Sequence, residues 1–430
     1  MGHYSLAQLL DTRSDGILSP LVHEPLGAAW VGNVAEYAGL QGVRALYSAP
    51  AAGTGIGGAA NVLRLTALHI ENSWQEWMGS MVARFPALAA AQRTLPEGTF
   101  IRGISFSHEG WRGGGGGYLS AESREQLRRL GALGTNAIAV VPYGFARGAN
   151  DEALSYTATD ETDADLAAAL NEAHRLGMFV LLKPQLWVGR GGFTGHLRFD
   201  DAATREAWMR SYREFILHYA RLAELEGFDL LSVGNELEGL TADEQSWRKL
   251  IADVRRVYHG PIVYASNWGR EFDKIQFWDA LDYISVNNYY PLRPANEAGG
   301  AAPRADELLA GADELANKLA AVSRRWRKPV LFTEVGYPSV RGGASEPWME
   351  DARRGISLDE QAAAYEAVFR AFAGRPWFRG MFWWKWPSSG RGGGPLDFSY
   401  TPMGKPAEQI LREWYLRIAA EQHAAEAGSL

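Results

Sequence analysis

From about residue 100 onward, short apolar runs alternate with longer segments in which apolar residues recur every third or fourth position. The short runs are typical of buried strands, and the longer periodic segments are typical of helices that cover a sheet. The predicted strands are 100–107, 137–143, 178–187, 230–236, 261–268, 283–290, 329–337 and 380–386. The predicted helices include 120–130, 163–175, 202–223, 305–324 and 358–372, with a closing helix near 405–418.

Eight strand–helix units over roughly 320 residues predict an α/β fold of the (β/α)8 TIM barrel type with an additional N-terminal segment. A doubly wound sheet is the alternative, but it has fewer strands and normally a phosphate-binding loop after the first strand. The barrel is therefore assigned to residues 96–420. Residues 1–95 form an accessory segment of unassigned fold, and residues 421–430 form a C-terminal tail.

The N-terminal segment contains a Gly-x-Gly-x-x-Gly match at Gly53–Gly58. A dinucleotide site also needs a preceding strand, a following helix and an acidic residue about 20 positions later. Here Pro50 and two alanines interrupt the preceding run, so the match stands alone. A nucleotide-dependent oxidoreductase is therefore a weak alternative, which a titration with nicotinamide or flavin would test.

Composition narrows the choice of function. The 430 residues are 47% hydrophobic and 22% charged with a net charge of −7, which argues against a basic nucleic-acid surface. No run approaches the ~20 apolar residues of a membrane span. With no cysteine and no HExxH motif, we expect neither disulfides nor thiolate chemistry, and no metal or cofactor. The start lacks secretory features, so localisation stays open between cytoplasmic and secreted after loss of a targeting segment.

Two glutamates, Glu236 and Glu334, each end a buried apolar run. A carboxylate at such a position is costly unless it is paired, hydrogen-bonded or used. In a barrel, the carboxyl ends of the strands form the face on which catalytic residues sit. Two carboxylates on that face can cleave a glycosidic bond, and a separation of about 5 Å would indicate retention of configuration. The simpler alternative is that each is an ordinary salt-bridged residue.

The contexts of these glutamates resemble a known group of enzymes. Gly234-Asn235-Glu236 closes the fourth predicted strand and Thr333–Tyr337 the seventh, as in the retaining β-glycosidases of clan A. More narrowly, residues 98–417 resemble glycoside hydrolase family 113, whose known members are mainly β-1,4-mannanases. The matching stretches are 103–106, 133–137, 181–184, 332–337, 383–386 and 404–407.

The resemblance implies that Glu334 is the nucleophile, that Glu236 is the acid/base residue and that Asn235 hydrogen-bonds the sugar 2-hydroxyl. It also implies β-1,4-mannan as the substrate, cut internally. The family usually has a histidine after Lys183-Pro184, whereas this chain has Gln185. That departure leaves open another β-hexoside, such as β-glucan, as the substrate.

Further residues at predicted strand ends are candidates for substrate binding. Tyr289 could hydrogen-bond Glu334 or pack under its loop, and Lys183 could bind a sugar hydroxyl or pair with a carboxylate. We expect Trp384 to form the floor under the reacting sugar. The other expected substrate-binding residues are Gln185, His108, Trp187, Trp268 and Trp386.

The expected partner is thus a carbohydrate, with no nucleic acid or membrane, and the oligomeric state stays open. A catalytically silent, carbohydrate-binding barrel is the alternative from another class. The presence of Glu236, Glu334 and Asn235 together argues against it, because a silent barrel has no need of all three.

Overall fold

The computed structural model describes residues 98–108, 117–147, 154–156, 161–189, 192–199, 201–295 and 302–428. The predicted accessory segment 1–95 and the Gly53–Gly58 match lie outside these residues.

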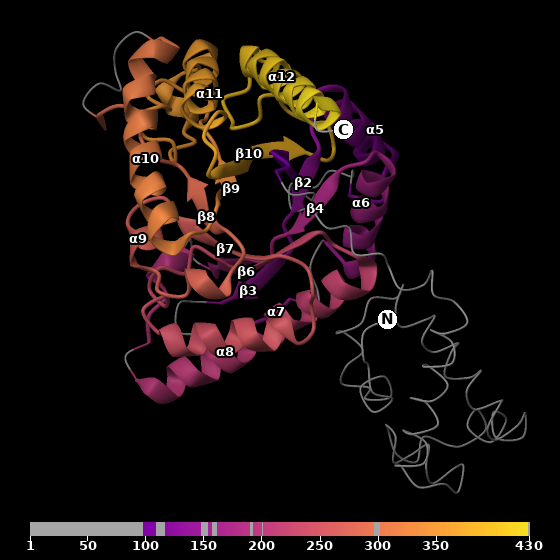
Figure 1. The fold of residues 1–430 in the computed structure, drawn as a ribbon, viewed down its shortest axis with the longest axis vertical. Helices are drawn as coiled ribbons and strands as arrows, with labels where there is room; N and C mark the ends of the chain where they lie inside the picture. The colour runs from indigo at the N-terminus through magenta and orange to yellow at the C-terminus, as the bar shows by residue number, and fades with distance from the viewer. Residues whose placement is uncertain are drawn as a thin grey trace, which may run out of the picture.

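Eight parallel strands form a closed barrel, which confirms the predicted fold (Figure 1). The order around the barrel is β1-β10-β9-β8-β7-β6-β4-β2. The strands are β1 (Ile101–Ser107), β2 (Ala137–Val140), β4 (Phe179–Leu182), β6 (Leu230–Asn235), β7 (Ile262–Asn267), β8 (Ile284–Asn288), β9 (Val330–Val335) and β10 (Phe378–Pro387). Each of the eight predicted strands overlaps one of these.

The second and third predicted strands each divide into two. After β2 and β4 the chain passes Pro142 and Pro184 and then forms β3 (Tyr143–Ala146) and β5 (Gln185–Val188). These two strands pair in parallel as a separate two-stranded sheet. Proline lacks the N–H that would continue a ladder, which accounts for the breaks. Gln185 and Trp187 therefore lie on a small sheet outside the barrel.

The barrel interior is a packed core. Its apolar side chains are Ile101, Ala137, Ala139, Leu181, Leu230, Val263, Leu331 and Phe382, all nearly or fully buried. Gly103 is required beside the largest of them, because a Cβ there would lie 2.4 Å from the Phe382 ring. Larger apolar residues on the other face of the strands pack against the helices, as the strand alternation requires.

An outer layer of helices surrounds the sheet (Figure 1). Its members are α5 (Ala121–Ala132), α6 (Asp163–Arg175), α7 (Ala202–Glu226), α8 (Glu244–Arg255), α9 (Glu271–Lys274), α10 (Ala305–Trp326), α11 (Leu358–Phe372) and α12 (Pro406–Gly428). The bounds of α6 and α11 match the predicted ones. The closing helix is longer than predicted, because α12 continues past residue 421 to Gly428. No described helix is long and apolar enough to cross a membrane.

Candidate active site

Both candidate glutamates lie at the carboxyl ends of barrel strands. Glu236 directly follows β6, and Glu334 is the penultimate residue of β9. Glu236 has a φ of 51°, a left-handed conformation that is uncommon for a non-glycine residue. Its backbone N–H donates to the carbonyl of Ala265 on β7 at 2.8 Å, which holds the segment in that conformation.

Both carboxylate oxygens of Glu334 have partners. The Tyr289 hydroxyl donates to Oε2 at 2.6 Å, and the Lys183 ammonium contacts Oε1. Lys183 is fully buried and also lies 3.5 Å from Asn235 Oδ1. A charged donor and a hydroxyl donor thus fix the orientation of a carboxylate that is only 3% exposed.

Asn287 connects the two glutamates. Its Nδ2 donates to Asn235 Oδ1 at 2.9 Å and to Glu236 Oε1 at 3.1 Å. Its Oδ1 accepts from the Thr333 hydroxyl, next to Glu334, at 2.9 Å. A continuous set of hydrogen bonds therefore links the ends of β6, β8 and β9.

The two carboxyls have different electrostatic surroundings. Burial, and then the negative charge of Glu334, raise the pKa of Glu236 from 4.5 to about 7. The hydrogen bond from Asn287 and the charge of Lys183 act in the opposite direction but do not cancel these effects. Glu236 therefore retains a proton near neutral pH, while the Lys183 ammonium contacts Glu334.

A pocket of about 560 Å³ opens beside Glu236. Its lining is mostly aromatic: Phe193, His196, Glu236, Asn267, Trp268, Tyr289, Trp348 and Tyr400. Trp268 and Trp348 stack with their ring centres 4.9 Å apart and an angle of 9° between the ring planes. Flat aromatic surfaces of this kind can pack on the apolar faces of sugars. Among the described residues, no group of three or more His, Asp or Glu could hold a metal ion.

Four buried side-chain amide atoms have no hydrogen-bond partner among the described residues. They are Nδ2 of Asn235, Nδ2 of Asn288, Oε1 of Gln185 and Oε1 of Gln361. Buried polar groups are normally satisfied, so such atoms call for a further partner. Two of the four lie beside the glutamates, at the ends of β6 and β8, where a hydroxyl-rich ligand could supply the missing bonds.

The tryptophans of β10 do not all face the same way. The ring of Trp384 lies 5.4 Å from the Lys183 ammonium, beside Glu334. Trp383 stacks on Tyr365 of α11, and the fully buried Trp386 donates to Gln126 of α5 at 2.9 Å. The contacts of Trp386 thus lie on the helix side of β10, which argues against its predicted role in substrate binding. Between Trp383 and Trp386 a register shift against β1 adds one residue to β10, which turns Trp386 toward the helices.

Some of the other predicted residues lie at the site, and others have different contacts. Tyr289 and Trp268 lie at the site, whereas Lys183, which is fully buried against Glu334, is a carboxylate partner and not an exposed sugar ligand. His108 packs on Tyr118, with ring centres 5.8 Å apart. Trp187, on β5, is 56% exposed.

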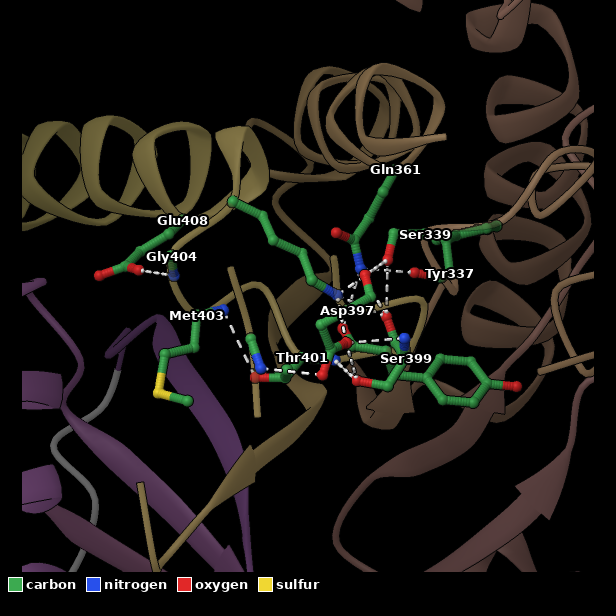
Figure 2. Close-up of polar contacts among 12 residues, drawn as sticks. Tyr337, Ser339, Gln361, Asp397, Ser399, Thr401, Met403, Gly404 and Glu408 are labelled. Carbon is green, nitrogen blue, oxygen red and sulfur yellow. Dashed lines mark hydrogen bonds and ion pairs between the residues drawn. The ribbon is translucent and has the colours of Figure 1, made fainter. Parts of the chain in front are cut away.

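A buried ion pair anchors the loops beside the pocket (Figure 2). The Lys405 ammonium donates to the carboxylate of Asp397 at 2.9 Å, to the Ser339 hydroxyl at 2.8 Å and to the Ser399 carbonyl at 2.8 Å. Burial acts to raise the pKa of Asp397, but Lys405 and Ser399 outweigh it and lower the value to about 2. Gln361 of α11 adds hydrogen bonds to the carbonyls of the same loops.

This cluster holds Tyr400 in the pocket wall. Gln361 donates to the Tyr400 carbonyl at 3.0 Å, and the Tyr400 hydroxyl donates to the carbonyl of Pro347 at 2.7 Å. Pro347 precedes Trp348, so one set of contacts fixes both rings. Tyr400 also packs edge-on against Tyr289, with ring centres 5.9 Å apart.

Sequence reasoning missed several of these residues. Asn287 could have been found in the same way as Glu236, because it is a polar residue at the end of a buried strand. Phe193, His196, Trp348 and Tyr400 sit on long loops after β5, β9 and β10, where no periodicity indicates their direction.

A parallel barrel with linked carboxyl groups at the carboxyl ends of its strands defines the class of barrel glycoside hydrolases. The sequence profile of Glycoside Hydrolase Family 113 matches residues 105–403. No curated protein matches the chain.

Solved structures agree with the profile. The family 113 β-mannanase AaManA from Alicyclobacillus acidocaldarius, in complex with ManMIm, is 32% identical with a TM-score of 0.65, covering 75% of this chain and 99% of that one. A second family 113 β-1,4-mannanase is 28% identical with a TM-score of 0.65, covering 74% and 99%. A family 5 mannosidase from Rhizomucor miehei shares the fold at 13% identity and a TM-score of 0.52, covering 76% and 94%. The chain belongs to glycoside hydrolase family 113 and is a glycoside hydrolase.

Proposed function

We propose that the protein is a retaining β-glycosidase in which Glu334 is the nucleophile and Glu236 the acid/base residue. The observation that carries this proposal is the division of charge between the two carboxyls. Glu334 contacts the Lys183 ammonium, and the pKa of Glu236 is raised to about 7. A retaining mechanism needs one ionised and one protonated carboxyl, about 5 Å apart, at the same moment.

In the first step, Glu334 attacks the anomeric carbon, the bond to the leaving oxygen breaks, and Glu236 gives that oxygen its proton. Esterification then removes the charge of Glu334, one of the causes that raise the pKa of Glu236. With that charge gone, Glu236 is a carboxylate that accepts a proton from the attacking water. Water then releases the sugar with its original configuration.

We further propose β-1,4-mannan as the substrate, cleaved internally. The support is membership of family 113 and the similarity to two β-mannanases of known structure. The aromatic pocket beside Glu236 fits a leaving group that consists of further sugar units. Asn235, adjacent to the acid, has an unpaired Nδ2 that can donate to a sugar hydroxyl.

A different β-hexoside, such as β-glucan, is the second candidate, because Gln185 stands where the family usually has a histidine. Its buried Oε1 has no partner, so it can accept from a sugar hydroxyl of suitable geometry. Equal enzyme loading on mannan, glucomannan, cellulose and xylan separates the two candidates. Release from glucan alone would refute the mannan assignment and leave the two-glutamate mechanism intact.

The mechanism is tested separately. NMR of the first-formed product should show retained β configuration. Glu334→Ala should abolish turnover, whereas Glu236→Ala should keep the first step on activated aryl glycosides, and azide should rescue its second step. An α-configured product, or equal loss in both variants without azide rescue, would contradict the assignment.

A further inference from the structure

One buried carboxyl beside the site has no part in the mechanism described above. Glu271, the first residue of α9, is fully buried. Burial is the main cause that raises its pKa to about 8, and the nearby carboxyls of Glu236 and Glu238 add to the effect. Lys274, on the same short helix, is 3.4 Å from Glu238. A carboxyl kept at such a cost calls for a role.

One oxygen of Glu271 is connected to the backbone of the acid/base segment. Oε1 accepts from the Tyr264 hydroxyl at 2.5 Å, and the same hydroxyl accepts from the backbone N–H of Leu237 at 2.9 Å. Leu237 directly follows Glu236. A hydroxyl has one proton, so accepting from Leu237 while donating to Glu271 fixes its orientation. Glu271 thereby orients the group that holds Leu237.

The Tyr264 ring also packs against the same segment. A Cβ at Gly234 would lie 2.6 Å from this ring, so the backbone two residues before Glu236 fits closely on it. Glu236 itself has a φ of 51° and donates its N–H to Ala265, the neighbour of Tyr264. Strand β7 thus holds an unusual backbone conformation from both sides of the acid/base residue.

The second oxygen of Glu271 holds the backbone of another residue that lines the pocket. Oε2 accepts from the backbone N–H of Asn267 at 2.6 Å. Asn267 lines the pocket together with Trp268, whose ring stacks on Trp348. A single carboxyl therefore ties the segment that carries the acid to the wall against which a leaving group would lie.

We propose that Glu271 is a positioning residue that, through Tyr264 and Asn267, fixes the direction in which Glu236 delivers its proton. This inference rests on the proposed role of Glu236. It adds that proton delivery depends on a side chain that touches neither substrate nor the reacting atoms.

The test uses Glu271→Gln and Tyr264→Phe. The first replaces one of the two accepting oxygens by an amide nitrogen, so Tyr264 and Asn267 can no longer both donate to this side chain; the second removes the hydroxyl while keeping the packed ring. Each variant is assayed on a β-1,4-linked oligosaccharide, whose leaving group needs protonation, and on a 2,4-dinitrophenyl β-glycoside, which needs almost none. Glu236→Gln sets the scale for complete loss of the acid.

Both variants should lose roughly 10-fold or more in kcat/KM on the oligosaccharide relative to the activated glycoside, a part of the 100- to 10,000-fold that a general acid supplies. Asp229→Asn is the matched control. Asp229 is 2% exposed and accepts from the Val180 N–H at 2.7 Å, but it precedes β6, at the opposite end of the barrel. Its variant should leave the ratio of the two activities unchanged, whatever its melting temperature.

An equal fall on both substrates in both variants would overturn the proposal, because general loosening of the fold affects both. An unchanged ratio with full activity would overturn it as well. The preferred substrate and the configuration of the product are measured first on the wild-type enzyme. A failure of the proposed function is therefore seen in the wild type, before any variant is compared. If the wild type prefers glucosides, the same ratio is measured with the glucose-based pair.

Discussion

Replacing Glu236 by glutamine should stabilise the protein, and increasingly so as the pH rises. Glutamine keeps an oxygen that can accept from Asn287 but cannot ionise. In the wild type the pKa of Glu236 is raised from 4.5 to about 7. Between these values the unfolded chain releases the proton while the folded protein retains it, so the wild type loses stability as the pH rises through this window.

The size of the effect follows from the raised pKa. At 1.36 kcal/mol per pH unit, the loss is about 1 kcal/mol at pH 5 and about 3 kcal/mol at pH 8. The gain in melting temperature of Glu236→Gln over wild type, measured by circular dichroism, should therefore be several degrees larger at pH 8 than at pH 5. Glu271 titrates in both proteins with burial as the main cause of its raised pKa, so most of its contribution cancels; the smaller part that comes from the charge of Glu236 is lost in the variant and acts in the same direction.

Glu125→Gln controls for the chemical change alone, since Glu125 lies on the surface of α5 with 65% of its side chain exposed. A gain for Glu236→Gln that is the same at both pH values, or smaller at pH 8, would refute the reasoning. The raised pKa would then not be a property of the folded state.

Three further predictions concern the surroundings of Glu334 and the tryptophans of β10. Tyr289→Phe should lower kcat roughly 10- to 100-fold with little change in KM, since a hydrogen bond to a charged group is worth about 1.5–3 kcal/mol; a raised KM at unchanged kcat would contradict this. Lys183→Met should lower the free energy of unfolding by about 3–5 kcal/mol, because Glu334 remains buried without its cation. Chemical denaturation measures this loss. Unchanged stability would mean that Lys183 serves only to bind the sugar. Trp384→Ala should raise KM, whereas Trp386→Ala should cost about 3–5 kcal/mol of stability and leave KM unchanged; steady-state kinetics with thermal unfolding distinguish the pair.

The fold could be predicted because burial on both faces makes parallel strands read as uninterrupted apolar runs. The same contrast exposed Glu236 and Glu334, since a carboxylate stands out at the end of an apolar run. Errors arose where a local event broke the pattern. An extra residue in β10 reversed the expected direction of Trp386, and two prolines divided predicted strands.

The partner of a side chain is harder to predict than its position. Lys183 was placed correctly at a strand end, but its contact is Glu334, 151 residues away, and no local pattern encodes that pairing. The pocket wall was missed for a related reason. Trp348 and Tyr400 sit on loops whose course depends on the buried Lys405 cluster and on Gln361, not on periodicity.

The carboxyl end of the barrel gathers three buried or partly buried glutamates, Glu236, Glu271 and Glu334, around one buried lysine. Lys183 contacts Glu334, and the other two have pKa values raised to about 7 and about 8. Near neutral pH the excess of acidic groups is therefore accommodated by retained protons and not by added cations. A second lysine beside Glu236 would favour the ionised form of its carboxyl and remove the proton that the leaving oxygen needs. Keeping a further cation away from Glu236 and Glu271 is thus what the proposed chemistry requires, and the buried Lys405 meets this condition because it is paired with Asp397.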